Sequence, residues 1–141
     1  MQMKQLVLDA NILIRAALGQ RVLALLKRYE DSVAFCVPDV CFADARKYIP
    51  GVAARRRIDP EIAFNVLDKM SLVVQSIDRG LYEADEASAV RRIGERDMAD
   101  WPVVATALLL NCPIWTEDQD FFGCGVATWT AATVEHYLET T

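Results

Sequence analysis

The chain has 141 residues, of which 53% are hydrophobic and 25% charged, and its formal net charge is −5. These values exclude intrinsic disorder and predict one compact domain over residues 1–141. The negative charge argues against a protein that wraps nucleic acid by bulk attraction, but it does not exclude a nuclease. The longest apolar run, 103–110, is too short to span a membrane, and no signal peptide is evident, so we expect a cytoplasmic protein.

Hydrophobic strands and helical patterns alternate along the chain. Leu6, Val7 and Leu8 form an apolar run typical of a parallel strand that is buried on both faces. Asn11 and Asp59 are placed as N-caps before helical patterns. In chain order the predicted elements are a strand at 6–8, a helix at 11–29, a strand at 33–37, helices at 38–50 and 59–70, a strand at 71–77, helices at 81–96 and 100–111, strands at 114–116 and 126–129, and a final helix from 131.

This alternation predicts a three-layer α/β/α fold with a mainly parallel central sheet. Right-handed crossovers place the C-terminal ends of parallel strands along one edge of the sheet. Asp9, at the end of the first strand, and Asp118, after the strand at 114–116, both fall on that edge. Open α/β sheets build their functional sites there.

Acidic residues stand where hydrophobic strands stop and helices begin, in segments far apart in sequence. They are Asp9, Asp44, Asp100, Asp118 and Asp120. Carboxylates that converged at one edge would repel one another unless a divalent cation neutralised them. Hard oxygen ligands suit Mg²⁺ or Mn²⁺, and no His or Cys cluster suggests zinc. The pattern makes a metal-dependent site the leading hypothesis.

Each acidic residue also has a structural interpretation. Asp9 could cap the helix after the first strand, although Asn11 is available for that role. Asp100 stands at a helix N-terminus, where the macrodipole favours a carboxylate, and Asp97 could share that work. The acidic pair after the strand at 114–116 could form a turn.

Asp44 is harder to explain structurally, because it lies within a predicted helix, where Asp has poor propensity. A position facing the sheet edge would explain it, and the alternative is a solvent-facing position beside Arg46 and Lys47. Two of the four cysteines, Cys36 and Cys112, stand in apolar runs and are expected to be buried thiols. Tryptophans 101, 115 and 129 also lie in apolar segments and are expected in the core rather than as stacking platforms.

The ordered set of motifs resembles the PIN domain, the nuclease fold named after the PilT N-terminus and used by VapC-type toxins. The matching segments are 8–13, 37–44, 100–108 and 115–121. They occur in the family's order and spread over most of the chain. Any one motif is weak evidence for the family, and the ordered set is strong.

The resemblance implies a metal-dependent endoribonuclease that hydrolyses RNA phosphodiester bonds with bound Mg²⁺ or Mn²⁺. Carried over by position, the implied metal ligands are Asp9, Asp100, Asp118 and Asp120, with Asp118 as the primary acid of its loop. Asp44 completes the catalytic set with Asp9, Asp100 and Asp118, but it stands where the family usually has Glu. Because Asp is one methylene shorter, we expect it to reach a metal only through water. Asn11 and Thr116 are the implied supporting residues.

Partners are implied by the same resemblance. As the toxin of a type II toxin–antitoxin pair, the protein would have a cognate antitoxin that plugs the acidic site with a basic side chain, and it would form a homodimer. The apolar stretches 22–26 and 62–67 could supply the dimer interface or pack on the sheet. Arg15 and the cluster Arg55, Arg56 and Arg57 are candidates for holding substrate phosphate, with a solvated face as the alternative.

Two other functions stay open at this point. A catalytically weak or inactive PIN-like binding or regulatory module is motivated by the short Asp44 and by the acidic charge. An aspartyl-phosphate hydrolase would normally carry a second acid two residues after the first. Here that position is Asn11, which argues against such an enzyme, and a single histidine leaves no credible Ser-His-Asp set.

Overall fold

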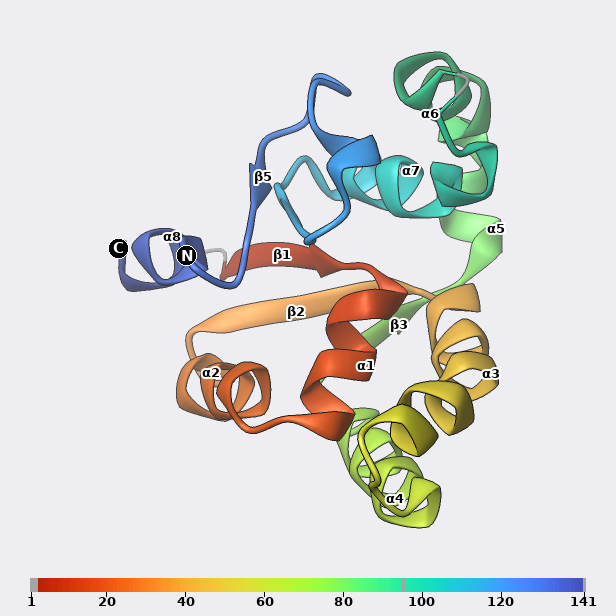
Figure 1. The fold of residues 1–141 in the computed structure, drawn as a ribbon. Helices are drawn as coiled ribbons and strands as arrows, with labels where there is room; N and C mark the ends of the chain where they lie inside the picture. The colour runs from red at the N-terminus through yellow and green to blue at the C-terminus, as the bar shows by residue number, and fades with distance from the viewer. Residues whose placement is uncertain (1–2, 95, 141) are drawn as a thin grey trace.

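A five-stranded parallel sheet lies between two groups of helices in the structure, a computed structural model that describes residues 3–94 and 96–140 (Figure 1). The strands are β1 (Lys4–Leu8), β2 (Val33–Pro38), β3 (Gln75–Ile77), β4 (Ile114–Trp115) and β5 (Thr128–Trp129). Their order is β3-β2-β1-β4-β5, and every ladder among the described strands is parallel. The predicted three-layer α/β/α fold with a mainly parallel central sheet is confirmed.

Helices cover both faces of this sheet. On one side of β1 and β2 lie α1 (Ala10–Leu18), α2 (Arg21–Tyr29), α3 (Val40–Arg55) and α4 (Pro60–Met70) (Figure 1). On the other side lie α5 (Arg79–Tyr82), α6 (Glu86–Ile93) and α7 (Trp101–Leu110) (Figure 1). The last helix, α8 (Val134–Glu139), is tied to the start of β1, because the hydroxyl of Tyr137 donates a hydrogen bond to the backbone oxygen of Gln5 at 2.8 Å.

The central strand and α7 supply much of the core. Leu6, Val7 and Leu8 are fully buried, as expected for a strand covered on both faces. Residues 102–107 of α7 are all buried, because this helix lies against α6 on one side and β1 and β2 on the other. Burial on both sides fixes the N-terminal end of α7, and therefore Asp100, relative to the sheet. No helix in the described part of the chain is both long and apolar enough to cross a membrane.

Several predicted boundaries in the first half of the chain were wrong. The helix predicted at 11–29 is two helices, because the backbone is extended at Gly19. Asp9, not Asn11, is the N-cap of α1, and its side chain accepts a hydrogen bond from the backbone N–H of Ile12 at 3.0 Å. Pro38 ends β2 instead of opening the next helix.

Helix α3 continues through Pro50 to Arg55, although the sequence predicted an end near the proline. Ala45, Ile49 and Ala53 are fully buried at four-residue spacing. Burial of this face therefore outweighs the backbone hydrogen bond that Pro50 cannot donate.

In the second half of the chain the helices and strands follow the predicted order, but several differ from the predicted length. The helix predicted at 81–96 is three short segments, 79–82, 83–85 and 86–93, and it ends at Gly94, whose φ is +66°. Glu95, which that prediction included, lies outside the described residues. The strand predicted at 71–77 begins only at Gln75, and the last helix begins at Val134 because residues 131–133 form a turn.

Two expectations about buried side chains are only partly confirmed. Cys36 is buried as predicted, but Cys112 is half-buried. Among the described residues all four cysteines are free thiols. Trp115 is fully buried in β4, whereas Trp101 and Trp129 are half-buried.

Candidate metal centre

A pocket of about 290 Å³ opens where β1 and β4 end, between α1, α3 and the start of α7. It is lined by Asp9, Ala10, Asn11, Ile14, Asp44, Tyr48, Asp97, Ala99, Asp100 and Asp118. Half of these residues are aspartates, and no Lys or Arg is among them. The four acidic residues predicted as the catalytic set come from four separate segments of the chain and line this one pocket.

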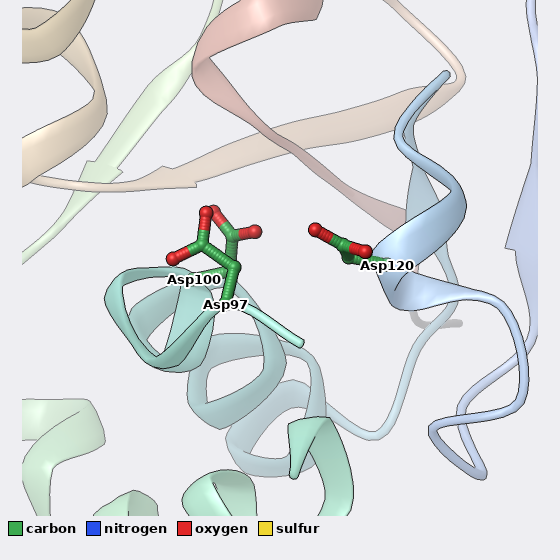
Figure 2. Close-up of side chains that lie close together, drawn as sticks. All are labelled: Asp97, Asp100 and Asp120. Atoms are coloured by element: carbon green, nitrogen blue, oxygen red, sulfur yellow. The ribbon is translucent and has the colours of Figure 1, made fainter. Parts of the chain in front are cut away.

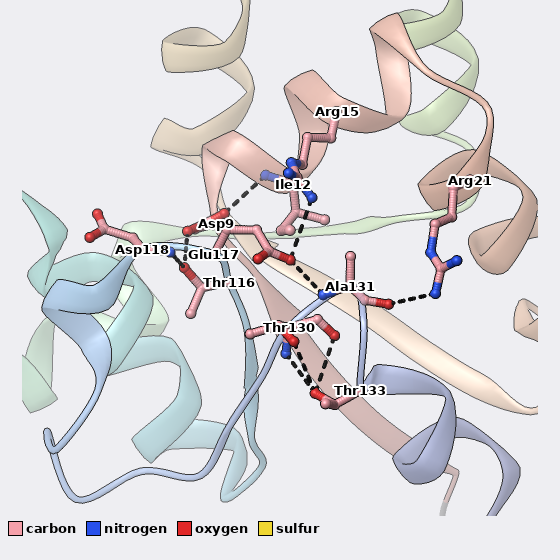
Figure 3. A network of polar contacts seen from close by, with 10 residues as sticks. All are labelled: Asp9, Ile12, Arg15, Arg21, Thr116, Glu117, Asp118, Thr130, Ala131 and Thr133. Atoms are coloured by element: carbon pink, nitrogen blue, oxygen red, sulfur yellow. Dashed lines mark hydrogen bonds and ion pairs between the residues drawn. The ribbon is translucent and has the colours of Figure 1, made fainter.

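Asp9 forms the floor of the pocket and is 5% exposed. Its Oδ1 accepts the N–H of Ile12, and its Oδ2 accepts a hydrogen bond from the hydroxyl of Thr116 (Figure 3). Burial raises the pKa of Asp9 to about 6, even though both hydrogen bonds act in the opposite direction. The nearby charges of Asp118 and Glu117 raise it further. A positive charge in the pocket would favour the ionised form.

Thr116 is fully buried directly after β4 and organises the loop that follows. Its Oγ1 accepts a hydrogen bond from the backbone N–H of Asp118 at 2.9 Å. Asp118 then caps a short 3-10 turn, because its Oδ1 accepts the N–H of Asp120 at 2.9 Å. A single hydroxyl thus connects the acid at the end of β1 with the acid after β4.

Asp100 stands at the start of α7, but its side chain makes no capping hydrogen bond. Its Oδ2 is buried and has no hydrogen-bond partner among the described residues. Burial, followed by the charges of Asp97, Asp118, Asp9 and Asp120, raises the pKa of Asp100 to about 7. A buried carboxylate oxygen without a donor is rare in proteins. At this position it fits a ligand for a cation.

A second grouping of carboxylates overlaps the pocket. Ligand oxygens of Asp97, Asp100 and Asp120 all lie within 4.8 Å of one another, and Figure 2 shows the three side chains converging from the start of α7 and the loop after β4. Asp120 does not line the pocket around Asp9, so the two groupings share only Asp97 and Asp100. The acidic surface therefore extends from Asp9 past Asp100 towards Asp120.

Asp97 was not predicted as a ligand, since the sequence suggested only a role at the helix start. It lines the pocket, and one of its carboxylate oxygens accepts the N–H of Ala99 at 3.0 Å. Its spacing of three residues from Asp100 was the available signal, because the 3-10 turn Met98–Asp100 brings both acids to the same side.

Asp44 reaches the pocket from α3 and is also exposed to solvent, so the two interpretations of this residue are not exclusive. Arg46, its basic neighbour, forms an ion pair with Asp68 on α4. Burial and the charges of Asp9, Asp44 and Asp100 hold the pKa of the Cys41 thiol well above its ordinary value. Cys41 is buried and does not line the pocket.

The arginines proposed to hold phosphate do not line the pocket. Nη1 of Arg15 lies 3.4 Å from Oε1 of Glu117, the residue next to Asp118 (Figure 3). The same Oε1 accepts the backbone N–H of Ala131 at 2.5 Å, so Glu117 joins the loop to α1 and to the segment before α8. Arg55, Arg56 and Arg57 are exposed at the C-terminal end of α3.

Comparisons with known proteins agree with this architecture. The model of the PIN domain family matches residues 7–139. The crystal structure of VapBC2 from Rickettsia felis, bound to a DNA fragment from their promoter, superposes with a TM-score of 0.62 at 15% identity, over 89% of this chain and 98% of that chain. The structure of FitAB bound to an IR36 DNA fragment gives a TM-score of 0.55 at 21% identity, over 89% and 94%. At these identities the two structures show the fold alone, and no curated protein matches significantly.

Proposed function

Because this chain belongs to the PIN domain family, a family of nucleases, we propose that it is a divalent-metal-dependent endoribonuclease. The proposed metal ligands are Asp9, Asp100 and Asp118, with Asp120 or Asp97 in the same shell. The observation that carries the proposal is the buried Oδ2 of Asp100, which lacks a donor among the described residues and lies among like charges. Oxygen-only donors of this kind suit Mg²⁺ or Mn²⁺.

The residues of the pocket have different proposed roles, which follow from the position of each side chain. Asp9, Asp100 and Asp118 would hold Mg²⁺ or Mn²⁺, which would supply the positive charge that favours ionisation of water and offsets the negative charge of the phosphodiester. Thr116 holds Oδ2 of Asp9 and the backbone of Asp118, so it fixes the directions in which these two acids point. Asp44 is exposed on the α3 wall, where its carboxylate can accept a hydrogen bond, and then a proton, from a water molecule in the pocket.

The proposed substrate is RNA, and the proposed biological role is the toxin of a type II toxin–antitoxin pair with a cognate antitoxin. Support comes from family membership and from the fold shared with the VapBC2 and FitAB structures. A homodimer is part of the same proposal. Val22, Leu25 and Leu26 of α2 are buried within the protomer, whereas Ile62 on α4 is 59% exposed. Of the two apolar stretches, α4 is therefore the better candidate for a dimer surface.

The test is cleavage of an end-labelled, mixed-sequence, single-stranded RNA in Mg²⁺, Mn²⁺ or EDTA. Wild type is compared with Asp9→Asn and Asp100→Asn, and Asp31→Asn, at an exposed turn outside the pocket, is the matched control. We expect cleavage by wild type and Asp31→Asn only, and its loss with EDTA. Equal cleavage by all four proteins would identify a contaminant. No cleavage by wild type, despite stabilisation by Mn²⁺, would favour the binding or regulatory module instead.

A further inference from the structure

One aromatic side chain at the acidic pocket has no evident part in holding metal or in folding. Tyr48 lies on α3 four residues after Asp44, on the same face of the helix, and both residues line the pocket. The side chain is on the rim, since Tyr48 is 55% exposed.

Two other tyrosines of the chain have clear structural roles. Tyr82 is fully buried and its hydroxyl donates a hydrogen bond to Asp39 at 2.7 Å. Tyr137 is half-buried and its hydroxyl donates to the backbone of Gln5. The hydroxyl of Tyr48 makes no hydrogen bond within the described residues, and its ring is left largely in water. Unlike Tyr82 and Tyr137, Tyr48 has no hydrogen-bonded partner among the described residues that would hold its ring away from the pocket.

The charge of the pocket indicates a function for the Tyr48 ring. Five aspartates repel the phosphates of an approaching polynucleotide, so the walls offer little attraction to the backbone until a cation is bound. The rest of the lining is uncharged, and Tyr48 is its only aromatic side chain. A nucleobase is neutral and presents a flat π face, which stacks on an exposed aromatic ring for about 1–3 kcal/mol per base. Nζ of Lys47 lies 5.4 Å from the centroid of the Tyr48 ring, so one face of the ring has a cation near it and the other face is the one on which a base would stack.

We propose that Tyr48 is a base-stacking platform that positions an unpaired nucleobase next to the phosphodiester in the acidic pocket. The inference rests on the proposed ribonuclease function and adds the substrate class to it. A base within a duplex already stacks on its neighbours and offers no free face, so the scissile bond must lie in single-stranded or loop RNA.

The test compares Tyr48→Ala, Tyr48→Phe and Tyr48→Trp with wild type on a short single-stranded RNA. Leu72→Ala is the control, because Leu72 is 87% exposed and does not line the pocket. Loss of stacking in Tyr48→Ala should raise KM about 10-fold or more and change kcat less, while the Phe and Trp variants keep KM near the wild-type value. The gain in Tm on adding Mn²⁺ should be the same in Tyr48→Ala as in wild type. An RNA with an abasic nucleotide beside the cleaved bond should remove the difference between Tyr48→Ala and wild type.

Each negative result has a separate meaning. If wild type cleaves RNA and Tyr48→Ala has the same KM, or if duplex and single strand are cleaved equally, the stacking inference is wrong and the nuclease proposal stands. If wild type cleaves no RNA, the nuclease proposal fails first. Fluorescence anisotropy of a labelled single strand, with Mn²⁺ present, then decides the inference: equal affinity of wild type and Tyr48→Ala, or no binding by either, overturns it.

Discussion

The hydroxyl of Thr116 donates a hydrogen bond to Oδ2 of Asp9, a residue 107 positions earlier in the chain. The two residues follow β4 and β1, which are neighbouring parallel strands. Since Oγ1 of Thr116 also accepts the N–H of Asp118, one buried hydroxyl fixes two acids that the sequence keeps far apart. The geometry of the candidate metal centre therefore depends on a residue that is not itself an acid.

Thr116→Val keeps the shape of this side chain and removes the hydroxyl. The variant leaves Oδ2 of Asp9 without its donor and the N–H of Asp118 without its acceptor, so we expect a loss of about 1–3 kcal/mol of stability. Misplaced ligands should also weaken Mn²⁺ binding by about 10–100-fold. Calorimetric titration with Mn²⁺ measures the second effect. Thr116→Ser, which retains the hydroxyl, should stay close to wild type, and equal loss in both variants would contradict the role given to the hydroxyl.

The metal-free protein should lose stability as the pH rises. The pKa of Asp9 is about 6 and that of Asp100 about 7 in the folded chain, against 3.8 for an ordinary exposed aspartate. At pH values between 3.8 and these raised pKa values, Asp9 and Asp100 are protonated in the folded state and ionised in the unfolded state. The stability that these protons confer is present below pH about 4 and is lost as the pH passes through 6 to 7.

Thermal unfolding in EDTA at a series of pH values from about 5 to about 8 measures this effect. Tm in EDTA should fall as the pH rises across the series. Adding Mn²⁺ should raise Tm by more at pH 8 than at pH 5, because cations and protons compete for the same carboxylates. A Tm in EDTA that rises steadily from pH 5 to pH 8 would contradict the buried, unpartnered state of these acids.

Asp100→Asn should make the metal-free protein more stable. The substitution removes a negative charge that four other aspartates oppose, and it leaves a side chain that can donate to them. In EDTA at pH about 8 we expect Tm to rise by a few degrees, whereas the gain with Mn²⁺ should disappear. Asp31→Asn is the control for removal of a charge elsewhere. A lower Tm in EDTA for Asp100→Asn would indicate that the carboxylate serves the fold rather than a metal.

Adjacent acids after β4 should behave differently. Glu117 points to Arg15 and to the backbone of Ala131, whereas Asp118 lines the acidic pocket. Glu117→Gln retains an acceptor for Ala131 and loses a partly exposed ion pair, so its stability should change by less than about 1 kcal/mol. Mn²⁺ binding should survive in Glu117→Gln and fall in Asp118→Asn. The reverse order in a Mn²⁺ titration would move the proposed ligand from residue 118 to residue 117.

Asp44→Glu tests the departure from the usual residue of the family. Asp44 lines the pocket but is exposed, and one more methylene would bring its carboxylate further into the site. We expect Asp44→Glu to bind Mn²⁺ at least as tightly as wild type and Asp44→Asn to bind it several-fold more weakly. Titration of both variants under the same conditions decides the matter, and weaker binding by Asp44→Glu than by Asp44→Asn would exclude a role for this carboxylate near the metal.

The sequence was sufficient for those parts of the site that depend on strand order. Asp9 and Asp118 directly follow apolar strands, and the C-terminal ends of parallel strands share one edge, so their convergence followed from the topology. The sheet itself was predicted from apolar runs. Residues 6–8, for example, are all apolar because this strand is buried on both faces.

Features that depend on how separate elements meet could not be predicted in this way. Tyr48 reaches the pocket because one face of α3 points into it, and no local pattern specifies that direction. For Asp97, the spacing of three residues from Asp100 was the sole local signal. Asp9 caps α1 in addition to lining the pocket, so the capping and site interpretations were never alternatives. The helix predicted at 81–96 is broken into short segments even though its residues favour a continuous helix.

The central claim is that Asp9, Asp100 and Asp118, from three separate segments of this chain, form one divalent metal centre. The most direct measurement is an anomalous difference map from crystals soaked in Mn²⁺. We predict a peak bounded by Asp9, Asp100 and Asp118, which disappears in crystals of Asp100→Asn grown and soaked in the same way. A map without a peak in the pocket, or with a peak that Asp100→Asn leaves unchanged, would contradict the claim.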